Sequence, residues 1–171
     1  MTAYTIRPAR PADLDRLAEL VLALQDHLEA CNPDLYKMTD EARSNLKGQL
    51  AGRLTAPQSC ALVAEHTEDG VVGVAFGRIL ASNRYIPDRA GSIDQAFVHT
   101  NHRRAGVGTR LVAGLCRFFE REGVDELTLR YVIDNAEAAG FWMALGFAPR
   151  IVTTGATRQT VEERLAQNRQ G

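Results

Sequence analysis

Glycine and arginine residues gather in the segment Arg103-Arg-Ala-Gly106-Val-Gly108. The segment directly follows an apolar stretch typical of a strand and directly precedes an apolar-periodic stretch typical of a helix. The first N–H groups of a helix have no intrahelical partner, and such an end binds anions. Glycines let the backbone approach a phosphate closely, while Arg103, Arg104 and Arg110 add fixed positive charge. The spacing predicts a phosphate-cradling turn; the alternative is an ordinary glycine turn that starts a helix.

Other nucleotide-binding and metal-binding signatures are absent from the sequence. No Gly-Lys-Ser/Thr marks a P-loop, and no third glycine completes a Rossmann pattern after the first predicted strand. His99 and His102 lie three residues apart, but no other metal-ligand signature accompanies them, so no metal site is predicted. The turn is therefore the main chemical signal of the chain.

Hydrophobic periodicity predicts the elements that position this turn. In chain order they are a strand at 4–7, helices at 11–31 and 39–55, strands at 60–64, 71–76 and 92–98, a helix at 106–122, a strand at 127–131, a helix at 136–145 and a strand at 147–153. This order predicts a mixed α/β sheet with helices on both faces. We expect a single domain over residues 1–171, with its core at about 4–153 and a polar tail at 154–171 that could form a short helix from Thr160 to Asn168.

The composition is that of an ordinary globular domain. Of the 171 residues, 45% are apolar and 24% charged, and the net charge of −1 argues against nucleic acid as a partner. No apolar run approaches the roughly 20 residues that span a bilayer and the first residues do not resemble a signal peptide, so we expect no membrane partner and a cytoplasmic location. Cys31, Cys60 and Cys116 are expected to be free thiols, with Cys116 in the core.

Two blocks of the sequence resemble the GNAT superfamily of N-acetyltransferases. The first is Ile93-Asp-Gln-Ala-Phe-Val98 followed by the turn at Arg103–Gly108, and the second runs from Asn135 to Phe147. Together they cover about Gly91 to Arg150, at the family's separation. The resemblance implies the GNAT fold: the order β-α-α-β-β-β-α-β-α-β, with helices on both faces of a twisted, mostly antiparallel and centrally splayed sheet.

The resemblance also implies how acetyl-CoA would bind. The backbone of Phe97 and Val98 would pair with the pantetheine arm like an added strand, Asn135 would contact the arm, and Phe141 and Trp142 of the second block would add cofactor contacts. The pyrophosphate would lie in the turn made by Arg103, Arg104, Ala105, Gly106, Val107, Gly108 and Thr109. The amine would attack the thioester directly, with the backbone N–H of Val98 stabilising the oxyanion and no metal taking part.

The proton that the attacking amine loses needs an acceptor, and the departing thiolate needs a donor. Asp94 is the candidate base because the family often has a glutamate or polar residue on this strand; alternatively it is a solvated strand residue, since a one-residue register shift changes its face. Where the family commonly has a tyrosine as the acid, this sequence has Trp142, whose indole cannot serve. Tyr131 is the speculative substitute, and Trp142 reads equally as a core residue.

The resemblance thus implies an enzyme that acetylates a primary amine, in a family where homodimers are frequent. The missing tyrosine favours one alternative, a non-catalytic acyl-CoA-binding sensor; a nucleotide-binding or phosphopeptide-binding module would leave the second block unexplained. Loops expected to wall the acceptor carry acidic and aromatic residues that would suit a cationic amine. They are Glu29, Asn32, Asp34, Tyr36, Tyr85 and Asp88.

Overall fold

The computed structural model describes residues 3–32, 34 and 37–168. The chain divides into two compact units, residues 1–135 and residues 136–171. The first unit contains the sheet and the turn before the third long helix, and the second begins directly after Asn135.

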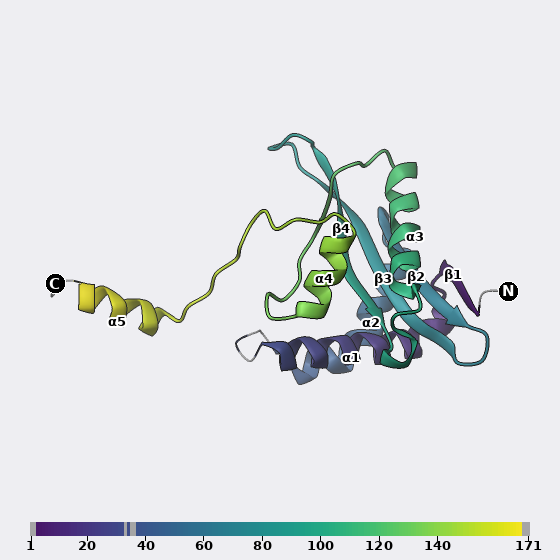
Figure 1. The fold of residues 1–171 in the computed structure, drawn as a ribbon, viewed down its shortest axis with the longest axis horizontal. Coiled ribbons are helices and arrows are strands. Elements are labelled where there is room, and N and C mark those ends of the chain that lie inside the picture. Colours follow the sequence, from purple (N-terminus) through teal and green to yellow (C-terminus); the bar gives the residue numbers. More distant parts are fainter. Residues whose placement is uncertain (1–2, 33, 35–36, 169–171) are drawn as a thin grey trace. The chain divides into compact units, whose positions relative to one another are not determined.

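A five-stranded mixed sheet forms the centre of the first unit (Figure 1). Its strands are β1 (Tyr4–Pro8), β2 (Ser59–His66), β3 (Gly70–Ala81), β4 (Arg89–Val98) and β5 (Leu127–Leu129), which lie side by side in chain order. The first four are antiparallel to their neighbours, and β5 runs parallel to β4. The predicted fold class, a mostly antiparallel mixed sheet flanked by helices, is confirmed.

Two helices, α1 (Leu14–Cys31) and α2 (Asp40–Thr55), cover one face of this sheet (Figure 1). Leucines recur at helical spacing along both, and the Thr39 hydroxyl accepts the Ala42 N–H to cap the start of α2. The core on this face joins Leu17, Leu20, Val21, Leu46 and Leu50 of the helices to Val63, Val71, Val74, Phe76 and Phe97 of the strands. Burial of these side chains holds the helix pair on the sheet.

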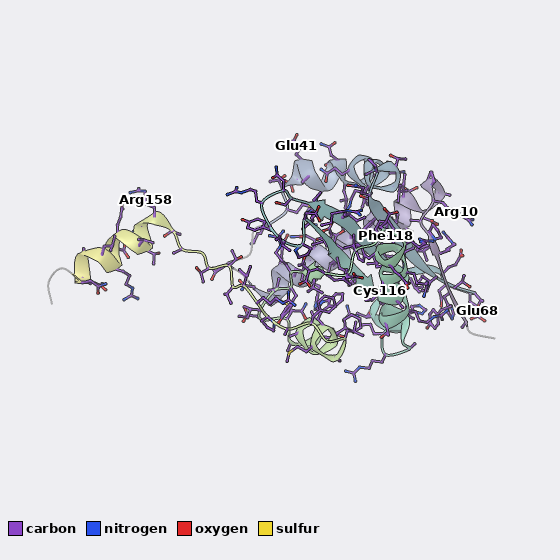
Figure 2. The ribbon with its side chains drawn as sticks, turned by 90° about the horizontal axis from the view of Figure 1, so that it is seen from above. Arg10, Glu41, Glu68, Cys116, Phe118 and Arg158 are labelled. Atoms are coloured by element: carbon purple, nitrogen blue, oxygen red, sulfur yellow. The ribbon has the colours of Figure 1, made fainter. Side chains whose placement is uncertain are left out.

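The opposite face carries α3 (Val107–Arg121), which packs across β1 to β4. Gly91 on β4 allows the close approach, since a Cβ there would lie 2.6 Å from Leu127 Cδ2 and 2.8 Å from the Phe119 ring. Cys116, labelled on α3 in Figure 2, is exposed, so its predicted core position is wrong. It lies on the solvent side of α3, between the inward-facing Leu115 and Phe119.

The sheet opens between its two parallel strands. Pairing of β4 with β5 covers only Gly91–Ile93 opposite Leu127–Leu129, whereas β4 itself continues to Val98. The predicted strand at 127–131 thus ends two residues early. Within the described part of the chain, residues 95–98 are paired with β3 on one side and have no strand neighbour on the other. The central splay expected from the resemblance is present.

The second unit contains α4 (Ala136–Ala144) and α5 (Arg158–Asn168), which confirms both predicted helices. The strand predicted at 147–153 is wrong: residues 147–157, all described, contain no strand. Pro149 has no N–H for a ladder, and Ile151 and Val152 are both exposed, so no face of this segment is buried as a paired strand requires. Among the residues described, no helix is both long and apolar enough to cross a membrane.

Candidate active site

The predicted phosphate turn lies directly before α3. A short 3-10 turn at Thr100–His102 precedes it, and Gly106 adopts the left-handed conformation, with φ +73°. The first helical bond runs from the Arg110 N–H to the Gly106 carbonyl, at 3.1 Å, so the N–H groups of residues 107–109 have no intrahelical partner. Only glycine adopts this φ without strain, and its absent side chain leaves open space at the helix end. The turn has the geometry of an anion site.

The three arginines of the turn have different surroundings. Arg103 Nε donates to the Val98 carbonyl at 3.0 Å, and its guanidinium lies 5.4 Å from the centroid of the Phe97 ring. Arg110 Nη2 donates to the Tyr4 carbonyl at 3.0 Å, whereas Arg104 is exposed. Arg103 and Arg110 therefore tie the turn to β4 and β1, and Arg104 is the arginine whose side chain extends into solvent.

The register of β4 directs the backbone of Val98 toward the open edge. The His99 N–H donates to the Val72 carbonyl at 2.8 Å, and Val98 is paired with Gly73. Antiparallel strands alternate in direction, so Phe97 bonds toward β3 while Val98 points away from it. The buried Phe97 side chain lies in the core beneath α1 and α2. The Val98 N–H therefore points toward the open edge and the Phe97 N–H toward β3, and the pairing of this backbone with a pantetheine arm stays a prediction.

A β-bulge in β4 decides which way Asp94 faces. The register with β3 pairs Phe76 with Gln95 and Gly77 with Ile93, so it skips Asp94. A bulge of this kind turns two successive side chains toward the same neighbour. Arg53 of α2 donates to both of them, from Nη2 to Asp94 Oδ2 at 2.6 Å and from Nη1 to Gln95 Oε1 at 3.4 Å.

Asp94 is the centre of a cluster that we call the bulge cluster, made of Arg53, Arg78, Ser92 and Asp94. Arg78 Nε lies 3.2 Å from Asp94 Oδ2, and the Ser92 hydroxyl donates to Asp94 Oδ1 at 2.7 Å. Both carboxylate oxygens are therefore engaged, and the side chain is only 15% exposed. Asp94 is not the solvated strand residue of the alternative interpretation.

The bulge cluster has two guanidinium groups and one carboxylate, so it carries net positive charge. Burial lowers the pKa of Arg53, the Asp94 carboxylate opposes this effect, and the neighbouring Arg78 adds to it. The Arg53 guanidinium also lies 4.5 Å from the centroid of the Phe76 ring. Sequence reasoning missed Arg53; the available signal was its position three residues after Leu50, on the apolar stripe of α2.

The segment after β5 meets the end of α1. Asn135 is buried, and its Nδ2 lies 3.4 Å from His27 Nε2, while Asn32 Nδ2 donates to Asp134 Oδ2 at 2.8 Å. Tyr131 lies two residues beyond β5 and is half-buried. These contacts place the predicted Asn135 beside α1, and His27 is a neighbour that the sequence did not indicate.

Some of the residues predicted to line the acceptor pocket form hydrogen bonds with nearby residues. Glu29 Oε1 accepts hydrogen bonds from Gln25, the Met38 N–H and Arg43, and the bond from Gln25 is the main cause that lowers the pKa of Glu29. Tyr85 is largely exposed, and Tyr36 lies outside the described residues.

In the second unit, Phe141 and Trp142 belong to an aromatic group on α4. The Trp142 ring meets Phe141 edge-on at 4.8 Å and Phe147 edge-on at 5.6 Å, and Trp142 is 7% exposed. This burial favours the interpretation of Trp142 as a core residue. Its predicted contact with the cofactor stays a prediction.

The site thus consists of an open β4 edge, a glycine turn and a helix N-terminus, an arrangement suited to an extended ligand that carries a phosphate group. The chain belongs to the acetyltransferase (GNAT) family, whose family model matches residues 21–147. It is therefore a member of a transferase family. No curated protein matches the sequence significantly.

Solved structures share this fold at low sequence identity. A Bacillus halodurans protein superposes with a TM-score of 0.79 at 15% identity, covering 90% of this chain and 99% of that one. A GCN5-related N-acetyltransferase from Ralstonia eutropha gives 0.73 at 16% identity, with 90% and 98% covered. An aminoglycoside antibiotic 6'-N-acetyltransferase from Acinetobacter baumannii gives 0.70 at 17% identity, with 90% and 98% covered.

Proposed function

We propose that this protein transfers an acetyl group from acetyl-CoA to a primary amine. The observation that carries the proposal is the continuity of the open β4 edge with the turn at Gly106. The Val98 N–H faces that edge, and the N–H groups of residues 107–109, which have no intrahelical partner, follow after the 3-10 turn and Gly106. An extended pantetheine arm and a pyrophosphate need these two kinds of donor in this order.

The residues of the turn fit such a ligand. A Cβ placed on Gly106 would meet no atom within 4 Å, so the space over the helix end is open. Arg104 is exposed beside it and can approach a phosphate, while Arg103 and Arg110 hold the turn rigid. Coenzyme A would supply the thioester, and the turn would fix its phosphates.

The proposed reaction is a direct attack of the neutral amine on the thioester carbonyl. The C–N bond forms as the carbonyl oxygen becomes an oxyanion, which the Val98 N–H stabilises. The C–S bond then breaks, the amine nitrogen loses its proton, and the CoA thiolate leaves. Tyr131 is the proposed proton donor to that thiolate, because the indole N–H of Trp142 can donate a hydrogen bond but is too weak an acid to give up its proton.

Asp94 remains the proposed base, and its present hydrogen bonds limit how it can take up a proton. Its oxygens contact Arg53, Arg78 and Ser92, so it must exchange one of these contacts for the proton of the amine. The net positive charge of the bulge cluster offers a second route, because nearby positive charge lowers the pKa of a bound ammonium group and raises its neutral fraction. The two routes differ in their response to a change at Asp94.

The acceptor class is tested best with a mixed panel of primary amines. Aminoglycosides belong in it because a structurally similar protein is an aminoglycoside 6'-N-acetyltransferase. Polyamines and peptides with a free N-terminus or lysine extend the panel to other cationic amines. Alcohols and thiols are the contrasting acceptors, and acetylation of these alone would contradict the amine proposal.

The decisive experiment measures release of free CoA thiol from acetyl-CoA in the presence of this panel. Gly106→Val is compared with the matched control Gly123→Val, because Gly123 has φ +66°, also faces open space and lies beyond the other end of α3. We expect release by the native protein and by Gly123→Val, and loss of release and of acetyl-CoA binding in Gly106→Val. Binding without release for every acceptor would favour the acyl-CoA sensor, and absence of binding would overturn the proposal.

A further inference from the structure

Two histidines and an aspartate meet at the turn between β2 and β3. His66 ends β2, Asp69 lies in the hairpin, and His102 ends the 3-10 turn before Arg103. Asp69 Oδ2 lies 2.8 Å from His66 Nδ1 and 3.6 Å from His102 Nε2. One ligand atom of each residue lies within 4.8 Å of the other two. Glu68, labelled in Figure 2, marks this hairpin on the surface.

Hydrogen bonds hold the His66 ring in this group. His66 Nδ1 lies 2.8 Å from Asp69 Oδ2, the distance of a hydrogen bond that the neutral ring donates when Nδ1 carries its proton. The backbone N–H groups of Glu68 and Asp69 lie 3.4 and 3.3 Å from the same nitrogen. A metal ion bound between Nδ1 and the carboxylate would take the place of that proton.

The second histidine is oriented by a partner on its far side. The Tyr4 hydroxyl lies 3.2 Å from His102 Nδ1, which leaves Nε2 directed at Asp69. Histidines that bind metals usually donate their other ring N–H to such a partner, which fixes the tautomer and the ring. The rings of Tyr4, His66 and His102 also pack together, with centroids 4.9 to 5.9 Å apart. The two imidazoles are therefore held in place before any ion arrives.

We propose that His66 Nδ1, His102 Nε2 and Asp69 Oδ2 bind a divalent transition-metal ion of the zinc type. Zinc bonds of about 2.0 Å to imidazole and carboxylate place tetrahedral ligand atoms roughly 3.3 Å apart. The distances from Asp69 Oδ2 to the two histidine nitrogens, 2.8 and 3.6 Å, bracket this value, and all three ligand atoms lie within 4.8 Å of one another, so side-chain rotations would complete the site. Water takes the fourth position, since Asp69 is 55% exposed. A depression of about 360 Å³, lined also by Thr5 and Glu65, lies beside His66.

The bound ion would connect two segments that the chain separates widely. Asp69 and His66 belong to the β2–β3 hairpin, and His102 is followed immediately by Arg103 and the phosphate turn. The backbone already joins them where the His99 N–H donates to the Val72 carbonyl. A metal at this position acts as a clamp that holds the start of the turn against the sheet. The site does not depend on the proposed transferase activity.

Binding is tested on the full-length protein after treatment with a chelator. Calorimetric titration with Zn²⁺ gives stoichiometry and affinity, and Co²⁺ gives a visible absorption band that reports its coordination. We expect one ion per chain with micromolar affinity or tighter, and a melting temperature that rises with added Zn²⁺. The absence of binding to the native protein would overturn the proposal.

Variants identify the ligands. Asp69→Asn and His102→Gln keep the size of the side chains, and each is expected to weaken binding of Zn²⁺ at least about tenfold and to reduce the Co²⁺ band. His99→Gln is the matched control, because the His99 ring is 6.1 Å from that of His102 but outside the ligand set. Circular dichroism checks that each variant is folded. Unchanged affinity in both ligand variants, or equal loss in His99→Gln, would contradict the site.

Discussion

Two arginine–carboxylate clusters lie in different parts of the sheet and have opposite ratios of arginines to carboxylates. In the edge cluster, one arginine, Arg7 of β1, is shared by the carboxylates of Asp13 and Glu65. In the bulge cluster, one carboxylate, Asp94 of β4, is shared by Arg53 and Arg78. The first cluster is net negative and the second is net positive.

The ratio of arginines to carboxylates suggests a structural role for the edge cluster and a chemical role for the bulge cluster. Arg7 donates to Asp13 from Nη1 and Nη2 and to Glu65 from Nε and Nη2, and its hydrogen bonds to Asp13 are the main cause that raises its pKa. Arg53 shares a single carboxylate with a second arginine, and burial lowers its pKa. A guanidinium paired with two carboxylates holds the segments that carry them together. A half-buried guanidinium that shares one carboxylate with a second arginine keeps excess positive charge, and next to an open strand edge it can act on a ligand.

The largest effect is expected for Asp94→Asn, which removes the proposed base and keeps a similar shape. Loss of a general base lowers kcat/KM by about 10²-fold at neutral pH, with recovery at high pH where the amine is already neutral. The measurement is the pH–rate profile of the variant beside that of the native protein. If instead the positive charge of the bulge cluster favours the neutral amine, the variant should react at least as fast as the native protein, because it makes the cluster more positive. A rate that is unchanged or raised would therefore exclude Asp94 as the base.

The next effect concerns stability and belongs to the edge cluster. Asp13→Ala should lower the free energy of unfolding by about 2–3 kcal/mol, because it leaves the mostly buried Arg7 with one partner. Chemical denaturation measures this change. Glu65→Ala is the control, since Glu65 is more exposed and its loss should cost less than about 1 kcal/mol. Equal costs in both variants would show that the edge cluster is not organised around Asp13.

Arg53→Met is the substitution that contrasts the two clusters most directly. The methionine can still pack on Phe76, and the remaining Arg78–Asp94 pair is neutral, so the free energy of unfolding should change by less than about 1 kcal/mol. We expect kcat/KM to fall about tenfold, because Asp94 loses its 2.6 Å contact and its orientation. Arg7→Met should do the reverse, with a large loss of stability and unchanged turnover per folded molecule. A similar loss of stability in both variants would erase the distinction between the clusters.

Local sequence patterns predicted the parts of the molecule that depend on neighbouring residues. The turn at Gly106 followed from glycine spacing beside a periodic helix, and the leucine stripes predicted α1 and α2. The bulge at Asp94 could not be predicted, because it appears only in the register between β4 and β3. The contact between Arg53 and Asp94 forms only when α2 packs on the sheet. The contact of His102 with Asp69 forms only when β4 pairs with β3, which brings the segment after β4 beside the β2–β3 turn.

The predicted strand at 147–153 illustrates the opposite error. The segment is expected to close the sheet, but a strand requires a partner strand and a buried face, and the local sequence specifies neither. Residue type predicts a core position for Cys116, although it is three residues before the buried Phe119 and directly after the buried Leu115. Residue type indicated burial there, and the helical phase of α3 decided otherwise.

The smallest effect, the acid dependence of stability, tests whether the edge cluster is structural. Hydrogen bonds from Arg7 lower the pKa of Asp13, and burial of Asp13 opposes this shift. A carboxyl group with a lower pKa in the folded state stabilises the fold above its unfolded pKa of about 3.9 and loses that contribution as the pH falls through the folded value. The stability difference between the native protein and Asp13→Asn should therefore be constant from neutral pH to about pH 5 and shrink below about pH 4. Melting temperatures across this range measure it, and a difference that stays constant into strong acid would mean that Asp13 acts through packing rather than through its charge.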